Sequence, residues 1–462
     1  MAGLSVAHLA ALAQMIERVP DVTLEKLSNA VRTMPGERAA ELAIVLADET
    51  RDRKRRFRVF RPILPMFKPR ADGVAAVRFP AAVLPRLWKA ASTKEPGWLV
   101  KLDTDPLTGQ PLDPANAEVV ATRICLAAAA AVRDQPDIIW PDDGKSAADR
   151  QADLEALAGV CDLAPLAARG LPSLTVWIGR PNEDQQAELR LLVRDAAAIA
   201  PEGAQRLLEI LFAHLEDPSR ILRLVVHAST AAGREMFLFD SELAVFVTRL
   251  IKTVEDRVAR ISTYRGDGGP DPFAVLREDI AWCATVLNEL DLTIQMQPGG
   301  VWGKQARDAR LRVNATLHKL LGKAEATVEK ALPTTKIQGA GRLARTTPLL
   351  DSTVPSETRD AALASLALVR AVRSSAGVFG SETLRYKVLQ SLTDRLATYA
   401  DQALDRINRN DVENVEHARQ IVLMVADFLT TLEAKDEAKT VRRRVAVAGA
   451  PAGHNDPSQG AA

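Results

Sequence analysis

The most distinctive chemistry in the sequence is a cluster of basic side chains near its start. Residues 51–70 read RDRKRRFRVFRPILPMFKPR and hold nine basic residues and three phenylalanines against one carboxylate, Asp52. Clustered guanidinium and ammonium groups bind anionic surfaces, and aromatic side chains among them add apolar contacts or stacking. The segment therefore predicts contact with an anionic partner.

The positive charge of this segment is local, because the whole chain carries 60 basic and 59 acidic residues for a net charge of +1. The rest of the chain is net negative, which disfavours wrapping of nucleic acid and favours docking on a confined acidic surface. A structural role is the alternative, in which the cations complement a helix C-terminus or pair with acidic helices. The residues predicted to bind an anionic partner are Arg51, Arg53, Lys54, Arg55, Arg56, Arg58, Phe57 and Phe60.

Residues 36–50 are expected to end a helix, which the basic segment can extend to Phe60. Residues 36–50 have a helical apolar face, and continuation to Phe60 would align several arginines on one side of that helix. Pro62 limits further extension, and Pro65 and Pro69 favour an extended chain after it. We therefore expect a charged helix end followed by a stiff apolar segment.

Motifs for catalysis, cofactors and metals are incomplete. The segment GGVWGK (299–304) is one residue short of a phosphate-binding loop, and GAGRLAR (339–345) lacks the third glycine of a dinucleotide fingerprint. The six histidines are never spaced for helical pairing with one another or with a cysteine, and DTDPLTGQPLD (103–113) lacks the glycine and glutamate of a calcium loop. The sequence therefore assigns no catalytic, cofactor-binding or metal-binding residue.

Two other classes of function stay open. An enzyme could assemble its site in residues 62–180, where irregular backbone, four tryptophans and a pair of aspartates concentrate: Trp88, Trp98, Trp140, Trp177, Asp142 and Asp143. A nucleic-acid-binding protein would need further cations beside residues 51–70, and the candidates are Arg342, Arg345 and Arg442 to Arg444. A deep pocket with converging polar groups would favour the enzyme, and an exposed groove would favour an adaptor.

Helical periodicity dominates the rest of the chain, which is 47% hydrophobic but only 4% aromatic. We predict a mainly all-α fold, an irregular stack or bundles of helices, with a small strand-containing insertion around 62–180. The runs GWLVKLDTD (97–105) and SLTVWIG (173–179) are the expected strands. Three consecutive helices are predicted between 182 and 231, and NEDQ (182–185) and NDVE (410–413) resemble capping boxes.

The predicted organisation has six parts. They are N-terminal helices at 1–61, a proline-rich region with helices and short strands at 62–181, a helical stack at 182–333, a linker or long loop at 334–355, C-terminal helices at 356–445 and a disordered tail at 446–462.

The first residues read as an amphipathic helix and not as a signal peptide, and no run reaches the length of about 18 apolar residues needed to span a membrane. Three scattered cysteines fit reduced thiols. These features predict a cytoplasmic, non-enzymatic scaffold or adaptor that binds protein partners and docks on a peripheral anionic membrane or other acidic surface through residues 51–70.

Overall fold

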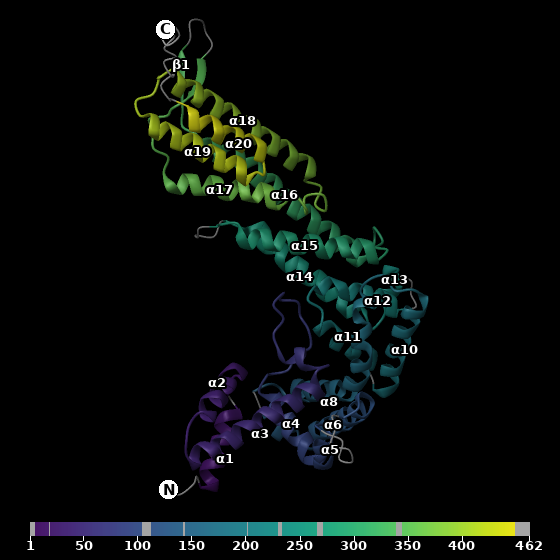
Figure 1. Cartoon of the computed structure of the whole chain (residues 1–462). Helices are drawn as coiled ribbons and strands as arrows, with labels where there is room; N and C mark the ends of the chain where they lie inside the picture. The colour runs from purple at the N-terminus through teal and green to yellow at the C-terminus, as the bar shows by residue number, and fades with distance from the viewer. Residues whose placement is uncertain are drawn as a thin grey trace, which may run out of the picture. The chain divides into compact units, whose positions relative to one another are not determined.

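Helices dominate the computed structural model (Figure 1), which describes residues 5–17, 19–103, 112–141, 144–200, 202–229, 233–265, 271–338 and 344–448. The chain divides into two compact units, Met1–Arg249 with Thr293–Gln295 and Leu250–Leu292 with Met296–Ala462. The prediction of a mainly all-α fold with a small strand element is confirmed, although the strands lie elsewhere than predicted.

Three helices open the first unit: α1 (Val6–Glu17), α2 (Asp21–Arg32) and α3 (Glu37–Phe60). The predicted helix at the N-terminus is confirmed by α1. Four buried side chains, Ile16, Leu24, Val31 and Leu46, form a small core between these helices. The far end of α3 belongs to a second, larger core, in which Val59 and Phe60 are buried. One long helix therefore connects the two cores.

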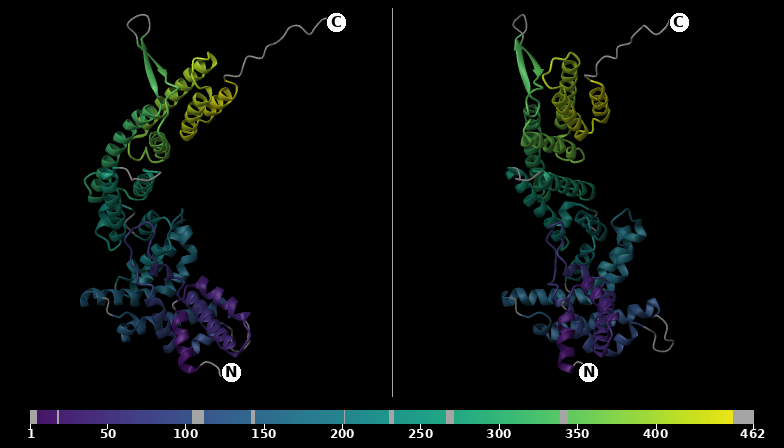
Figure 2. Two further views of the ribbon diagram at one scale, coloured as in Figure 1. Left: turned by 90° about the vertical axis from the view of Figure 1, so that its left-hand side faces the viewer. Right: turned by 60° about the vertical axis from the view of Figure 1, so that its left-hand side comes forward.

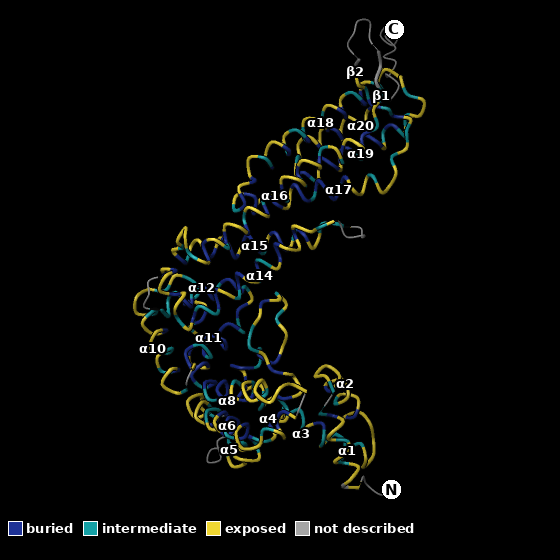
Figure 3. Tube along the Cα trace, turned by 180° about the vertical axis from the view of Figure 1, so that it is seen from behind, coloured by how far each residue is buried: buried dark blue, intermediate teal, exposed yellow. Residues whose placement is uncertain are grey.

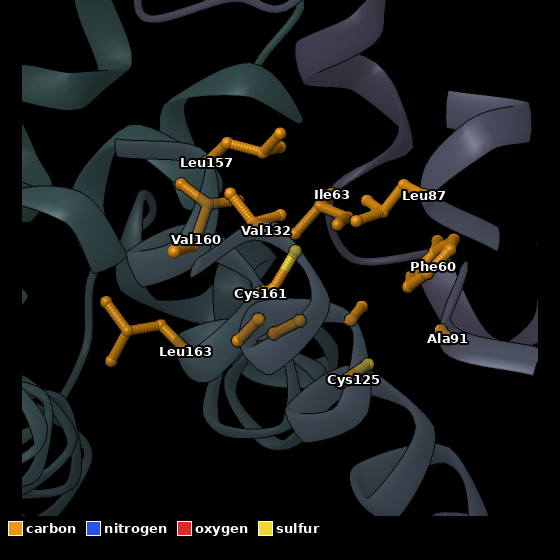
Figure 4. Close-up of a cluster of buried hydrophobic side chains, with 14 of the residues drawn as sticks. Phe60, Ile63, Leu87, Ala91, Cys125, Val132, Leu157, Val160, Cys161 and Leu163 are labelled. Atoms are coloured by element: carbon orange, nitrogen blue, oxygen red, sulfur yellow. The ribbon is translucent and has the colours of Figure 1, made fainter. Parts of the chain in front are cut away.

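The larger core lies among α4 (Val83–Lys94), α5 (Pro96–Lys101), α6 (Pro114–Asp134), α7 (Pro136–Ile139) and α8 (Ala147–Gly170). Figure 4 shows side chains from four helices meeting there, including Phe60 of α3, Leu87 of α4, Val132 of α6 and Cys161 of α8. Alanines such as Ala128 are fully buried in α6. Small side chains let α6 and α8 approach closely.

Both expected strands in residues 62–180 are wrong, because the described residues in them are helical. The first of these runs overlaps α5, and the second lies in η2 (Leu171–Ser173) and α9 (Leu174–Trp177). Pro96 occupies the first turn of α5, where a proline favours helix, and Trp177 is fully buried. Apolar runs this short fit a buried helical turn as well as a strand.

The three predicted helices after residue 182 are confirmed as α10 (Glu183–Ile199), α11 (Gly203–Ala213) and α12 (Ile221–Ala228), with η3 (Pro218–Arg220) before the last. The capping box at the start of α10 is also confirmed, since Asn182 and Gln185 exchange two hydrogen bonds of 2.9 Å. A short helix, α13 (Glu235–Phe239), follows.

Helix α14 (Ala244–Thr263) starts in the first unit and continues into the second, which also contains α15 (Ala274–Thr293) and α16 (Val301–Lys330). Asp279 of α15 is buried and accepts hydrogen bonds of 2.8 Å from Arg257 and Arg260 of α14. Two arginines on one carboxylate lock α14 to α15 because breaking a buried ion pair is costly.

A two-stranded antiparallel hairpin follows α16 (Figure 2). Strand β1 (Thr334–Gln338) pairs with β2 (Ala344–Pro348), with Thr334 opposite Pro348. The prediction of a linker or long loop at 334–355 is therefore wrong for the described part of 334–348. Neither strand has the alternating apolar face that reveals a strand in sequence.

The last helices are α17 (Ser356–Ala371), α18 (Glu382–Asn408), α19 (Val415–Thr431) and α20 (Lys435–Val447). Their buried faces turn inward and their exposed faces outward (Figure 3). Of the predicted C-terminal helices, α19 and α20 are separated by Glu433, which has a φ of 67°. The capping box at 410–413 is wrong, because Asn414 caps α19 by accepting from the His417 N–H.

The expected tail starts at 446, but Ala448 is buried and its carbonyl accepts from Arg419 Nε at 3.2 Å. Residues 449–462 lie outside the described residues. Among those that are described, α6 alone has the length and apolar composition to cross a membrane. Eight of its side chains lie in the buried core, including Val120, Ile124 and Val132, so the helix fits a core helix equally well.

Candidate docking groove

The basic segment divides between the surface and the core of the first unit. Helix α3 does continue to Phe60, as predicted, but the chain after it forms the short helix η1 (Leu64–Phe67) and is not extended. Phe60 is fully buried, with its ring centroid 5.9 Å from that of Trp88 in an edge-on contact. Phe57 is 62% exposed. Of the two predicted binding phenylalanines, only Phe57 is therefore on the surface.

Arg53 is a structural residue, and its side chain is only 13% exposed. It forms ion pairs of 2.6 Å with Glu49 and with Asp21. Its terminal nitrogens also donate to three carbonyls at the end of α1, those of Ile16, Glu17 and Val19. Burial by itself lowers the pKa of Arg53, but the hydrogen bonds that Arg53 donates to Glu49 and Asp21 outweigh it and raise that pKa. Arg53 thus caps α1 and joins it to α2 and α3.

Arg55 and Arg58 attach α3 to the chain that follows α5. Arg55 binds Asp103, with its Nη2 2.5 Å from Oδ2, and Arg58 donates to the carbonyl of Leu102. The hydrogen bonds that Arg55 donates to Asp103 raise the pKa of Arg55. Binding of an anionic partner requires exposed and unpaired cations, and Arg53 and Arg55 are neither. Arg51 is exposed but lies 2.9 Å from Asp48.

The remaining predicted cations are differently placed. Lys54 is exposed, and none of the described carboxylates pairs with it. Arg56 is half-buried, and burial lowers the pKa of its guanidinium group despite the nearby charge of Glu49. Arg61, one turn beyond Arg58, is exposed and also lines the groove described next.

A groove of about 1230 Å³ runs between α2 and α3. Its apolar lining comes from Leu24 on α2 and from Ala43, Leu46, Ala47 and Phe57 on α3. Six basic residues line it against two acidic ones, Asp21 and Glu25, and Asp21 is already engaged by Arg53. The basic residues are Arg32, Arg51, Arg53, Lys54, Arg58 and Arg61. We call this feature the α2–α3 groove.

Sequence reasoning found one wall of the α2–α3 groove and missed the other. Helix α2 contributes Leu24, Ser28 and Arg32, none of which stands out in a motif. The Ser28 hydroxyl oxygen is enclosed without a hydrogen-bond partner in the described structure. Pairing of α2 with α3 arises from the small core around Leu46, and one available signal was the apolar spacing of Leu24 and Val31.

The residues named for an enzyme site do not converge on a polar pocket in the described structure. Trp88, Trp140 and Trp177 are buried in the core, and Trp98 stacks under Lys101, whose Nζ lies 4.1 Å from the ring centroid. Asp142 and Asp143 lie outside the described residues.

A cavity of about 500 Å³ between α8 and α11 does contain charged groups, but these are engaged with one another or with neighbours. Glu209 is buried and binds Arg249, and Arg206 lies 3.2 Å from Glu202.

The cations named for a joint nucleic-acid patch are also partly engaged. On α20, Arg442 pairs with Asp427 at 2.8 Å and Arg444 pairs with Asp401. Arg342 and the side chain of Arg345 lie outside the described residues. A joint patch with residues 51–70 remains a prediction.

Comparisons of this chain with protein-family models, with curated proteins and with solved structures found no match.

Proposed function

We propose that this chain is a helical adaptor that binds an acidic amphipathic helix of a partner protein in the α2–α3 groove. One observation carries the proposal: an apolar lining bordered by an excess of basic over acidic residues in a groove between two helices. Helix-in-groove recognition uses such a surface, with apolar anchors in the groove and charges at its margin.

The dimensions of the groove support a helical partner. Its lining runs along α3 from Ala43 to Arg61, which corresponds to about 27 Å at the rise of an α-helix. A partner helix of about five turns covers that length. A concave surface also suits a helix better than a flat lipid bilayer, so we favour the protein partner over an anionic membrane.

The basic lining of the groove indicates that the partner carries negative charge. Lys54 and Arg61 are exposed near one end of the groove, beside the exposed ring of Phe57. A partner with carboxylates at that end and leucine-like anchors along one face matches both properties. Mutual attraction of opposite charges then speeds encounter and fixes orientation.

We place the protein in the cytoplasm under this proposal. Cys125, Cys161 and Cys283 are buried free thiols. Burial raises the pKa of Cys125 and of Cys283 to about 12, which keeps both thiols protonated and unreactive. Such core thiols suit a reducing compartment.

The test is binding of a designed peptide of about five helical turns, with leucines on one face and glutamates on the other, measured by fluorescence anisotropy. The Lys54→Glu/Arg61→Glu variant should bind at least about tenfold more weakly, since the cost of like charges is added to lost attraction. Added salt should weaken binding to the unchanged protein.

The matched control is Lys26→Glu/Arg38→Glu, which makes the same charge change at exposed residues that do not line the groove. It should retain most of the peptide affinity. Equal losses of peptide affinity in the two variants would mean that the peptide responds to the net charge of the protein and not to the groove. Binding of phosphatidylserine vesicles in place of the peptide would favour the membrane alternative.

A further inference from the structure

A separate charged site lies at the start of α18 in the second unit. Arg385 is only 8% exposed, and its Nε is enclosed without a hydrogen-bond partner. No carboxylate in the described structure forms an ion pair with it. An enclosed N–H donor without an acceptor is unfavourable, because its lost hydration is not replaced. Such a residue points to a ligand that the chain does not itself supply.

The same end of α18 is uncapped. Ser381 occupies the N-cap position but makes no side-chain capping bond, although its own N–H donates to the Ala376 carbonyl at 2.8 Å. The first N–H groups of a helix have no partner within the helix, and they carry the positive end of its dipole. In α18 these groups belong to Glu382, Thr383 and Leu384.

Arg385 and the helix start share one face. Arg385 follows Ser381 by four residues, so the two lie on one face of α18, and the side chain of a helical residue covers the turn on its N-terminal side. Asn314 of α16 fixes the turn there: its amide donates to the Phe379 carbonyl at 2.6 Å and to the Ser381 hydroxyl oxygen at 3.1 Å. The hydroxyl hydrogen of Ser381 is then available to a ligand.

We propose that this corner, formed by Arg385, Ser381 and the first N–H groups of α18, binds a phosphate group, from inorganic phosphate or a small phosphomonoester. The guanidinium group matches two phosphate oxygens, and the helix N–H groups match a third. A tetrahedral anion suits donors that approach from different directions better than a planar carboxylate does. Glu382 is exposed in the same turn, and its charge moderates the affinity.

The first measurement is isothermal titration of the full chain with inorganic phosphate and, separately, with glycerol phosphate, at constant ionic strength. We expect binding of at least one. Arg385→Met should weaken it by about ten- to a hundredfold, the usual effect of losing hydrogen bonds to a charged group. Binding of inorganic phosphate alone would identify the free anion as the ligand. Binding of both compounds would show that the site also accepts phosphomonoesters. Binding of neither would overturn the proposal.

Thermal unfolding separates the site from a merely structural role for Arg385. Phosphate should raise the Tm of the unchanged protein and should not change the Tm of Arg385→Met. In phosphate-free buffer the two proteins should melt at similar temperatures. An equal rise in Tm for the variant would contradict the assignment. Glu382→Gln changes only an exposed side chain and serves as the second variant. It should tighten phosphate binding several-fold, and unchanged or weaker binding would count against the site.

Discussion

Arg53 Nη1 lies 2.6 Å from Asp21 Oδ1, and this contact ties the first residue of α2 to α3. The same guanidinium group serves the carbonyls at the end of α1, so one side chain organises all three N-terminal helices. The neighbouring Lys54 makes no such contact and lines the α2–α3 groove. Adjacent residues of one basic cluster thus have separable roles in folding and in docking.

Replacement of Arg53 by Met should destabilise the first unit by about 1–3 kcal/mol, because Glu49 loses a largely buried partner and the end of α1 loses its cap. Lys54→Met should change the free energy of unfolding by less than about 0.5 kcal/mol, since Lys54 is exposed and pairs with none of the described carboxylates. Urea denaturation followed by circular dichroism measures both. Similar values for the two variants would contradict the structural role of Arg53.

The two phenylalanines of the basic segment should respond oppositely to truncation. Phe60→Ala should cost about 3–5 kcal/mol, because the fully buried ring packs against Trp88. Phe57→Ala should leave the free energy of unfolding nearly unchanged and weaken binding of the acidic peptide, since its ring is 62% exposed and lines the groove. A strong loss of stability in Phe57→Ala, with peptide affinity retained, would remove Phe57 from the proposed site.

The stability of the first unit should decline as the pH falls below about 6.5, the ordinary pKa of histidine. Burial lowers the pKa of His214 and of His227 in the folded state, so the unfolded chain takes up protons at a higher pH than the folded chain. The stabilisation from the neutral rings is present above pH 6.5. It is lost as the pH falls through the folded-state pKa values of the two histidines. Each ring contacts a backbone carbonyl, that of Pro62 for His214 at 2.7 Å and that of Trp177 for His227 at 2.9 Å.

The matched variant for this pH dependence is His214→Gln/His227→Asn, whose amide nitrogens can replace the ring donors without titrating. Its stability should vary less with pH than that of the unchanged protein. Urea denaturation at about pH 7.5 and at about pH 5.5 tests the difference, since these values bracket the ordinary histidine pKa. Identical pH profiles would mean that these rings do not control the acid sensitivity.

Helices could be predicted from the sequence where local signals and packing favour the same structure. The prediction of secondary structure failed where packing alone determines it. Asn182 and Gln185 form the predicted capping box, and Pro62 follows the end of α3 as expected. Trp177 lies in a β-branched run that reads as a strand, yet its burial favours a helical turn. The basic cluster identified one wall of the candidate site. Which cations are free depends on distant partners such as Asp103, and spacing along the chain does not reveal these.

Two glycines in helices should respond oppositely to substitution by alanine. A Cβ at Gly203 would lie 1.9 Å from the carbonyl oxygen of Ala196, so α11 could not keep its close approach to α10. We expect Gly203→Ala to lower the free energy of unfolding by about 1–3 kcal/mol, as overpacking of a core does. Gly322 lies in the middle of α16 with open space around it, and Gly322→Ala should stabilise the helix by about 0.5–1 kcal/mol. Chemical denaturation of both variants checks the signs, and a neutral Gly203→Ala would mean that α10 and α11 are not packed as closely as described.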